Sequence, residues 1–199
     1  LLPLGVMERH AYHLPLGTDM LIARELCRRA AELEPAVIFP DFYFTKIHEA
    51  RCFAGAVAIE ADLILRLLEN TCAEIARNGL KKIVIISGHG GNYFLTRYLA
   101  QSQLASRRDY ALYVVDPAPP PSEEAELSSL FKTGYGDHAG EGETSQVLAF
   151  RPELVQMERV PEQPEEGAAR GRLKTLADVN VFTAIWWYAD YPTHYAGDA

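Results

Sequence analysis

Side chains of the kind that bind metal ions occur in three short segments of the chain. The first segment, 8–19, reads ERHAYHLPLGTD; the second, 87–92, reads SGHGGN; and the third, 138–145, reads HAGEGETS. The candidate residues are Glu8, His10, His13 and Asp19 in the first segment, His89 in the second, and His138, Glu141 and Glu143 in the third. Because four of the six histidines of the chain lie in these segments, their joint placement favours one functional site.

Imidazoles and carboxylates together are a suitable donor set for divalent ions such as zinc, manganese and iron. A carboxylate can bridge two such ions and offset part of their charge. A water molecule bound between two divalent ions loses its proton near neutral pH and becomes a nucleophile. The three segments therefore predict a site for two divalent ions that carries out hydrolysis.

Each segment also has a purely structural interpretation. A single histidine in a loop can be a surface residue or a hydrogen-bonded residue of the core. The glycines of SGHGGN can form a tight turn between a strand and a helix. Glu141 and Glu143 fall where acidic side chains stabilise the first turn of a helix.

A further set of residues is suited to binding a substrate. The predicted substrate-binding residues are Gly90, Gly91, Asn92 and Trp187. The glycines and Asn92 could offer backbone N–H groups to an oxyanion, although Asn92 could instead cap the next helix. Trp187 could line a pocket, or the run 186–188 could belong to the core or to a subunit interface. His194 could also enter the site, and His13 could orient a ligand from behind it.

The segments that must position these residues alternate between strands and helices. Apolar runs at 1–7, 81–87 and 109–116 predict buried strands, and 36–44 is rich in residues that favour strands. Apolar residues at helical spacing predict helices over 18–34, 60–80 and 93–108, and the stripe of the second comprises Leu63, Leu67, Ile75 and Ala76. This alternation indicates an α/β fold with a mostly parallel sheet. Ligands of such sheets bind at the carboxyl ends of the strands, where the first two polar segments lie.

The bulk composition narrows the class of protein. A length of 199 residues predicts one domain, 1–199, which we expect to be trimmed at both ends because the chain starts LLPLGV and stops at YAGDA. A net charge of −8 argues against nonspecific binding to nucleic acid. No apolar run is long enough to span a membrane. Cys27, Cys52 and Cys72 are widely spaced, which favours free thiols and a cytoplasmic protein.

Taken together, LPLGVMERHAYHLPLGTD, ISGHGGN and HAGEGETSQVL resemble, in this order, the three signature segments of the creatinine amidohydrolase (creatininase) family. The resemblance covers nearly the whole chain. It implies a Rossmann-like, three-layer α/β/α sandwich that commonly assembles into homo-hexamers. It also implies two divalent ions per chain, Zn, Mn or Fe, and hydrolysis of a C–N amide bond in a small molecule such as a cyclic amide or a formamide.

The resemblance also implies a role for individual residues. The implied metal ligands are Glu8, His10, Asp19, His89 and Glu143. Asp19 matches a bridging aspartate of the family. Gly91 stands where creatininase itself has a further glutamate ligand, so we expect Glu143, or else Glu141, to supply that carboxylate. The implied catalytic residues are His138, which resembles a histidine that passes a proton to the leaving nitrogen, and Glu143.

Several residues depart from the family pattern. Arg9, Ala11 and Tyr12 stand where glutamine, glycine and proline are common, and Gly91 disfavours creatinine as the substrate. Two alternatives follow. The chain could trim a peptide in the maturation of a cofactor, as some family members do, or it could be a noncatalytic binding or assembly subunit on the same fold.

Overall fold

A computed structural model describes residues 1–116, 121–132, 138–162, 171–195 and 199. The chain divides into two compact units, and each is treated by itself. Unit 1 comprises Leu1–Glu8, Asp19–His48 and Val57–Pro117, and unit 2 comprises Arg9–Thr18, Glu49–Ala56 and Ala118–Ala199. The single domain expected over residues 1–199 stays a prediction.

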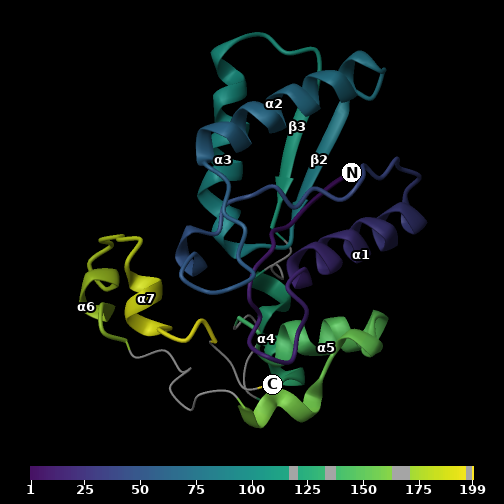
Figure 1. Cartoon of the computed structure of the whole chain (residues 1–199). Coiled ribbons are helices and arrows are strands. Elements are labelled where there is room, and N and C mark those ends of the chain that lie inside the picture. The colour runs from purple at the N-terminus through teal and green to yellow at the C-terminus, as the bar shows by residue number, and fades with distance from the viewer. Residues whose placement is uncertain (117–120, 133–137, 163–170, 196–198) are drawn as a thin grey trace. The chain divides into compact units, whose positions relative to one another are not determined.

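Unit 1 is built on a parallel sheet with the strand order β1-β2-β3 (Figure 1). The strands are β1 (Leu2–Leu4), β2 (Lys82–Ser87) and β3 (Ala111–Val115), and the helices are α1 (Thr18–Leu33), α2 (Ala61–Arg77) and α3 (Tyr93–Ser102). The core is formed where apolar residues of β1 and β2 meet those of α2 and α3: Leu2, Leu4, Ile85, Ile64, Leu68, Leu95 and Leu99. The α/β class expected from the sequence is therefore confirmed.

Short helices and turns make up the rest of the described chain. In order they are η1 (His48–Ala50), η2 (Gly90–Asn92), η3 (Gln103–Ala105), α4 (Pro121–Leu130), α5 (Glu141–Phe150), η4 (Pro152–Leu154), η5 (Met157–Glu162), α6 (Lys174–Ala177) and α7 (Trp186–Asp190). Of these, η2, α5 and α7 carry residues that the sequence singles out.

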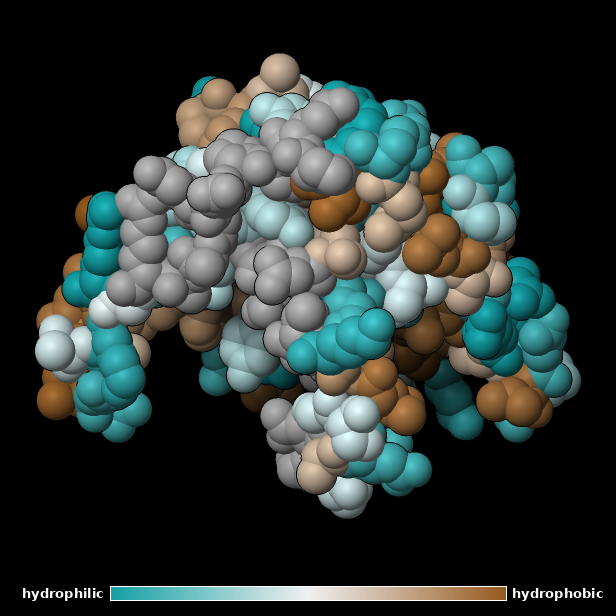
Figure 2. Space-filling model, turned by 90° about the horizontal axis from the view of Figure 1, so that it is seen from below, coloured by the Kyte–Doolittle hydropathy of each residue, from teal (hydrophilic) through white to brown (hydrophobic). Residues whose placement is uncertain are grey.

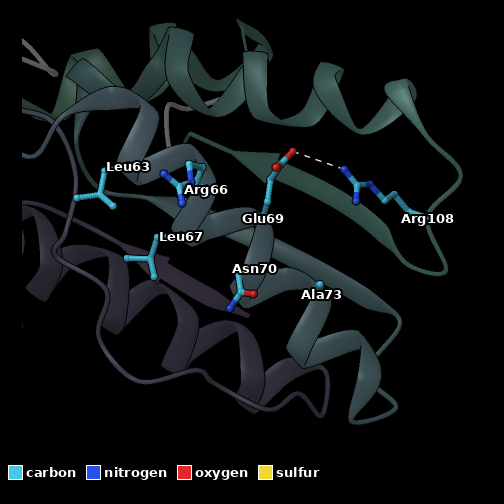
Figure 3. A pocket seen from close by; sticks show the side chains of 7 residues that line it. All are labelled: Leu63, Arg66, Leu67, Glu69, Asn70, Ala73 and Arg108. Atoms are coloured by element: carbon cyan, nitrogen blue, oxygen red, sulfur yellow. Dashed lines mark ion pairs between the residues drawn. The ribbon is translucent and has the colours of Figure 1, made fainter.

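The buried face of α2 differs from the one expected. Its buried residues are Ile64, Leu68, Cys72 and Ala76, whereas Leu63 and Leu67 are 52% and 38% exposed. Both exposed leucines line an open groove of about 540 Å³ (Figure 3), together with Arg66, Glu69, Asn70, Ala73 and Arg108. An ion pair of 3.5 Å joins Glu69 to Arg108 across it. The groove contains none of the candidate metal ligands.

Two strand predictions also need correction. β3 is a strand, but it is not buried on both faces, because Tyr113 and Val115 are 54% and 43% exposed. It is the edge strand of the sheet, and no described residue buries the side chains of Tyr113 and Val115. The segment 36–44 forms no strand of its own, and only Phe42 joins the sheet, through an isolated bridge to Leu4.

The surface mixes apolar and polar side chains. Figure 2 shows one face on which hydrophobic residues lie among hydrophilic ones. Within the described ranges, none of the helices has both the length and the hydropathy needed to cross a membrane.

Candidate metal centre

A first group of potential ligands, Glu8, Asp19 and His89, lies in unit 1. The Nδ1 atom of His89 is 2.9 Å from Oε2 of Glu8 and 3.1 Å from Oδ2 of Asp19. The three residues are buried, and each can offer one ligand atom within 4.8 Å of the other two. Two carboxylates and one imidazole at this spacing are a suitable donor set for a divalent ion.

Glu8 and Asp19 lie in one short segment of the sequence, and the fold brings the distant His89 to them. Glu8 follows β1, His89 follows β2, and Asp19 lies in the first turn of α1. Gly88 makes this approach possible, because a Cβ atom at that position would lie only 2.0 Å from the carbonyl oxygen of Asp19. The N–H of Gly88 also donates to the carbonyl of Leu4 at 2.9 Å, which continues the pairing of β2 with β1 beyond the strands.

The electrostatics of this group favour a positive charge between the carboxylates. Burial alone would lower the pKa of His89, but the carboxylates of Glu8 and Asp19 outweigh it and raise that pKa to about 10. Two buried carboxylates are costly unless a cation or a proton balances them. A divalent ion therefore matches both the charge and the donor atoms of this group.

A second group, His10, His138 and Glu143, lies in unit 2. The Nε2 atom of His10 is 3.5 Å from Oε2 of Glu143, and the rings of His10 and His138 are 4.3 Å apart. Their ligand atoms also lie within 4.8 Å of one another. The N–H of Ala139 donates to the same Glu143 oxygen at 2.7 Å, which orients the carboxylate at the start of α5.

The charge state of Glu143 suits metal binding. Burial opposes its ionisation, but the nearby rings of His10 and His138 and the Ala139 N–H outweigh that effect and lower its pKa. Glu143 is thus held as a carboxylate, which is the form that binds a metal ion.

His13 supports this second group by contacting Thr144, the residue of α5 that is next to Glu143. Its Nε2 atom lies 2.9 Å from the hydroxyl of Thr144, which follows Glu143 in the chain. Burial, followed by the proximity of His10, lowers the pKa of His13 to about 4. A neutral His13 can therefore hold Thr144 without adding charge to the group.

Backbone strain marks the same region. Ala11, Ala139 and His194 adopt positive φ angles of 54°, 56° and 57°. Non-glycine residues rarely adopt this conformation, and they persist in it where the surrounding structure requires it, often at functional sites. Ala11 and Ala139 directly follow His10 and His138, so the strained conformations lie next to two potential ligands. The common glycine at position 11 of the family pattern fits this conformation.

The other predicted residues have specific partners. Glu141 accepts a hydrogen bond from the N–H of Lys132 at 2.7 Å and belongs to neither group, so the geometry favours Glu143 as the additional ligand. The indole N–H of Trp187 donates to His194 at 2.7 Å. That N–H is therefore already engaged within the protein, although the face of the indole remains a candidate for substrate contact.

The turn after β2 corrects one detail of the sequence interpretation. Gly90, Gly91 and Asn92 form η2, but the N–H of Asn92 donates to the carbonyl of His89 at 3.1 Å and is committed to the turn. The Asn92 side chain does not cap α3; it donates to Ser87 and Thr45 at 3.3 and 3.4 Å. Of the three predicted backbone donors, Gly90 and Gly91 remain candidates.

Sequence inspection missed residues that act through close approach or through the backbone. In the sequence, Gly88 cannot be told from an ordinary turn glycine. The backbone carbonyl of Arg9 accepts a hydrogen bond from Nε2 of His138 at 2.9 Å, and no residue type in the sequence indicates this contact. Thr144 is part of the third segment, but its pairing with His13 depends on the fold.

The chain is similar in sequence to proteins of known activity. The chain is 25% identical over 178 residues to the creatinine amidohydrolase of Pseudomonas putida, covering 82% of this chain and 68% of that protein. It is 31% identical over 169 residues to the mycofactocin precursor peptide peptidase of Mycobacterium ulcerans, covering 80% of this chain and 61% of that protein. The chain thus spans less than two thirds of the length of this second relative.

Solved structures with the same fold include metal-containing creatininases. A candidate creatinine amidohydrolase of Bacteroides fragilis superposes with a TM-score of 0.77 at 25% identity, over 99% of this chain and 77% of that one. A manganese form of creatininase superposes with a TM-score of 0.66 at 26% identity, over 79% of this chain and 67% of that one. The family model described as creatinine amidohydrolase matches residues 1–197. This chain therefore belongs to the creatininase family.

Proposed function

We propose that this chain is a metal-dependent amidohydrolase that hydrolyses a C–N amide bond of a small molecule. The observation that carries the proposal is the buried group Glu8, Asp19 and His89, whose two carboxylates surround one imidazole nitrogen at 2.9 and 3.1 Å. Membership of a hydrolase family supports the reaction class.

We infer that the site holds two ions of Zn, Mn or Fe. Glu8, Asp19 and His89 of unit 1 would hold one ion, and His10 and Glu143 of unit 2 would hold the other. When bound, such ions supply a water nucleophile at neutral pH and polarise the carbonyl of the amide.

The residues of the chain supply the proton transfer. The Nε2 atom of His138 lies 2.9 Å from the carbonyl of Arg9. A carbonyl can only accept, so this nitrogen carries a proton. In the neutral ring, Nδ1 is then the atom that accepts a proton, and it can deliver one to the departing nitrogen. Neutral His13 and the Ala139 N–H hold Thr144 and Glu143 in place beside it.

A peptide amide is a second candidate substrate class. The relative with 31% identity is named as a precursor peptide peptidase, whereas the relative named as a creatinine amidohydrolase is 25% identical. Gly91 also lacks the carboxylate that the resemblance to creatininase itself would require. A noncatalytic subunit on the same fold remains the alternative to both, and a homo-oligomer stays a prediction.

The metal content of the purified chain tests the proposal. We expect about two ions per chain in the wild type after purification without chelator, by elemental mass spectrometry. Glu143→Ala should lower this to about one ion. Glu141→Ala is the matched control, because Glu141 lies in the same helix turn but pairs with the Lys132 backbone; it should retain two. Absence of metal from the wild type would refute an enzymatic role of this kind.

A further inference from the structure

Trp187 and His194 form a contact whose donor and acceptor are fixed by chemistry. The indole Nε1 of Trp187 lies 2.7 Å from Nδ1 of His194. An indole N–H can only donate, so Nδ1 of His194 must carry a lone pair. The proton of the neutral His194 ring is therefore on Nε2.

His194 is held in one position by its surroundings. The residue is fully buried, and its backbone adopts a φ of 57° while its N–H donates to the carbonyl of Tyr191 at 3.0 Å. The ring of Phe53 lies 5.5 Å from the His194 ring. Such a strained and enclosed residue persists when the structure around it requires that geometry.

The His194 ring packs directly on His138. The two ring centroids are 4.4 Å apart with an angle of 57° between the planes, and the Trp187 ring meets His138 edge-on at 5.8 Å. His138 is also bound through Nε2 to the Arg9 carbonyl. One hydrogen bond thus fixes which nitrogen of His138 holds a proton, and two packed rings limit how that imidazole can rotate.

We propose that Trp187 and His194 are a positioning pair for His138. The indole N–H of Trp187 fixes the tautomer and orientation of His194, and the His194 ring fixes the orientation of His138. This inference rests on the proposed function, in which His138 moves a proton to the leaving group. It assigns the indole N–H of Trp187 a role inside the protein, while the substrate-binding role expected for Trp187 stays a prediction.

Nitrogen NMR of the histidine rings in metal-free protein tests this directly. Long-range ¹H–¹⁵N spectra distinguish a ring nitrogen with a lone pair from one that carries a proton. His194→Gln and His138→Gln identify the signals of each ring by their loss. In the wild type we expect His194 to have its proton on Nε2 and His138 to have a proton on Nε2. A proton on Nδ1 of His194 in the wild-type spectrum would by itself overturn the proposal, before any variant of Trp187 is made.

Trp187→Phe then tests the link between the rings, with Trp186→Phe as the matched control. Trp186 is the adjacent residue, is 38% exposed and lies 5.3 Å from the Trp187 ring. Trp187→Phe keeps an aromatic ring but removes the N–H, so it should shift the ring signals of both His194 and His138. Trp186→Phe should shift neither. Equal effects of the two variants, or an effect on His194 that leaves His138 unchanged, would contradict the positioning role.

These results are independent of the metal measurement. If the wild type binds no metal but the histidine signals behave as expected, the proposed function fails, and only the fixed arrangement of Trp187, His194 and His138 stands. If the wild type binds two ions but Trp187→Phe leaves the signals of both histidine rings unchanged, the positioning pair fails and the proposed function stands.

Discussion

At the scale of the residue, the candidate centre depends on a close approach that only glycine allows. The carbonyl of Asp19 occupies the space where a side chain at position 88 would begin. His89, the next residue, and Asp19 are both potential ligands, so this approach determines the distance between them. The glycine is thus as important to the site as the residues that carry charge.

We therefore predict that Gly88→Ala disrupts the first ligand group. The added methyl would lie 2.0 Å from a backbone oxygen, which a side-chain movement cannot relieve. We expect a loss of about 1–3 kcal/mol in the free energy of unfolding, as for other overpacked sites, and a loss of metal. Chemical denaturation and metal analysis would measure both.

Gly90→Ala is the control for this prediction. It lies in the same turn, and a Cβ atom there would meet no other atom within 4 Å. It should leave the metal content unchanged. Equal behaviour of the two variants would show that the close approach at position 88 has no special role.

The identities of the candidate ligands were accessible from the sequence because their residue types and spacing carry the chemistry. Glu8, Asp19 and His89 were expected together, and the structure places them together. The sequence analysis preferred Glu143 but left Glu141 open. Both stand in the first turn of α5, and it is their different hydrogen-bond partners that favour Glu143. Their roles as metal ligands stay a prediction until metal is measured.

At the scale of the element, α5 is the support of the second ligand group. Its first turn presents Glu143, and the pairing of Thr144 with His13 holds that turn against the loop that carries His10. Removing the hydroxyl of Thr144 would leave a buried nitrogen of His13 without its hydrogen-bond partner.

We predict that Thr144→Val destabilises the protein by about 1–3 kcal/mol, the usual cost of a buried polar group that loses its partner. Valine keeps the shape of the side chain, so the effect isolates the hydrogen bond. Thr144→Ser retains a hydroxyl and should behave more nearly like the wild type. A free energy of unfolding that is unchanged in Thr144→Val would exclude this support role.

The elements themselves were predicted better than their exposed faces. The helices α1, α2 and α3 and the strands β1, β2 and β3 all occur where the sequence indicates them. The expected stripe on α2 was wrong at Leu63 and Leu67, because the leucine-rich helix has apolar residues on adjacent positions and periodicity alone does not choose between them. The exposure of β3 depends on its place at the edge of the sheet, which a single strand sequence does not encode.

At the scale of the whole molecule, binding of ions should contribute to stability. A ligand that binds only the folded state stabilises it by about 2.7 kcal/mol when its free concentration is one hundred times the dissociation constant. The potential ligand His89 is far from Glu8 and Asp19 in the sequence and meets them only in the fold, so the unfolded chain should bind metal weakly.

We accordingly predict that adding Zn²⁺ or Mn²⁺ to chelator-treated protein raises its melting temperature, and that chelator reverses the rise. Differential scanning calorimetry would measure the shift. Asp19→Asn should reduce it, since the amide removes one charge from the group while preserving its size. A shift of equal size in Asp19→Asn would point to binding elsewhere on the chain.

The register of the sheet also has a consequence for the order of folding. Leu4 pairs with Ser87, so the strands that lead into Glu8 and His89 are separated by most of unit 1 in the sequence. Parallel pairing across such a distance requires closure of a long loop before the contacts form, and it is intrinsically slow. An ion could therefore bind this centre only after β1 and β2 have paired. Metal binding would then be a late step that stabilises a sheet already formed, and the ion would not be the nucleus around which the chain folds.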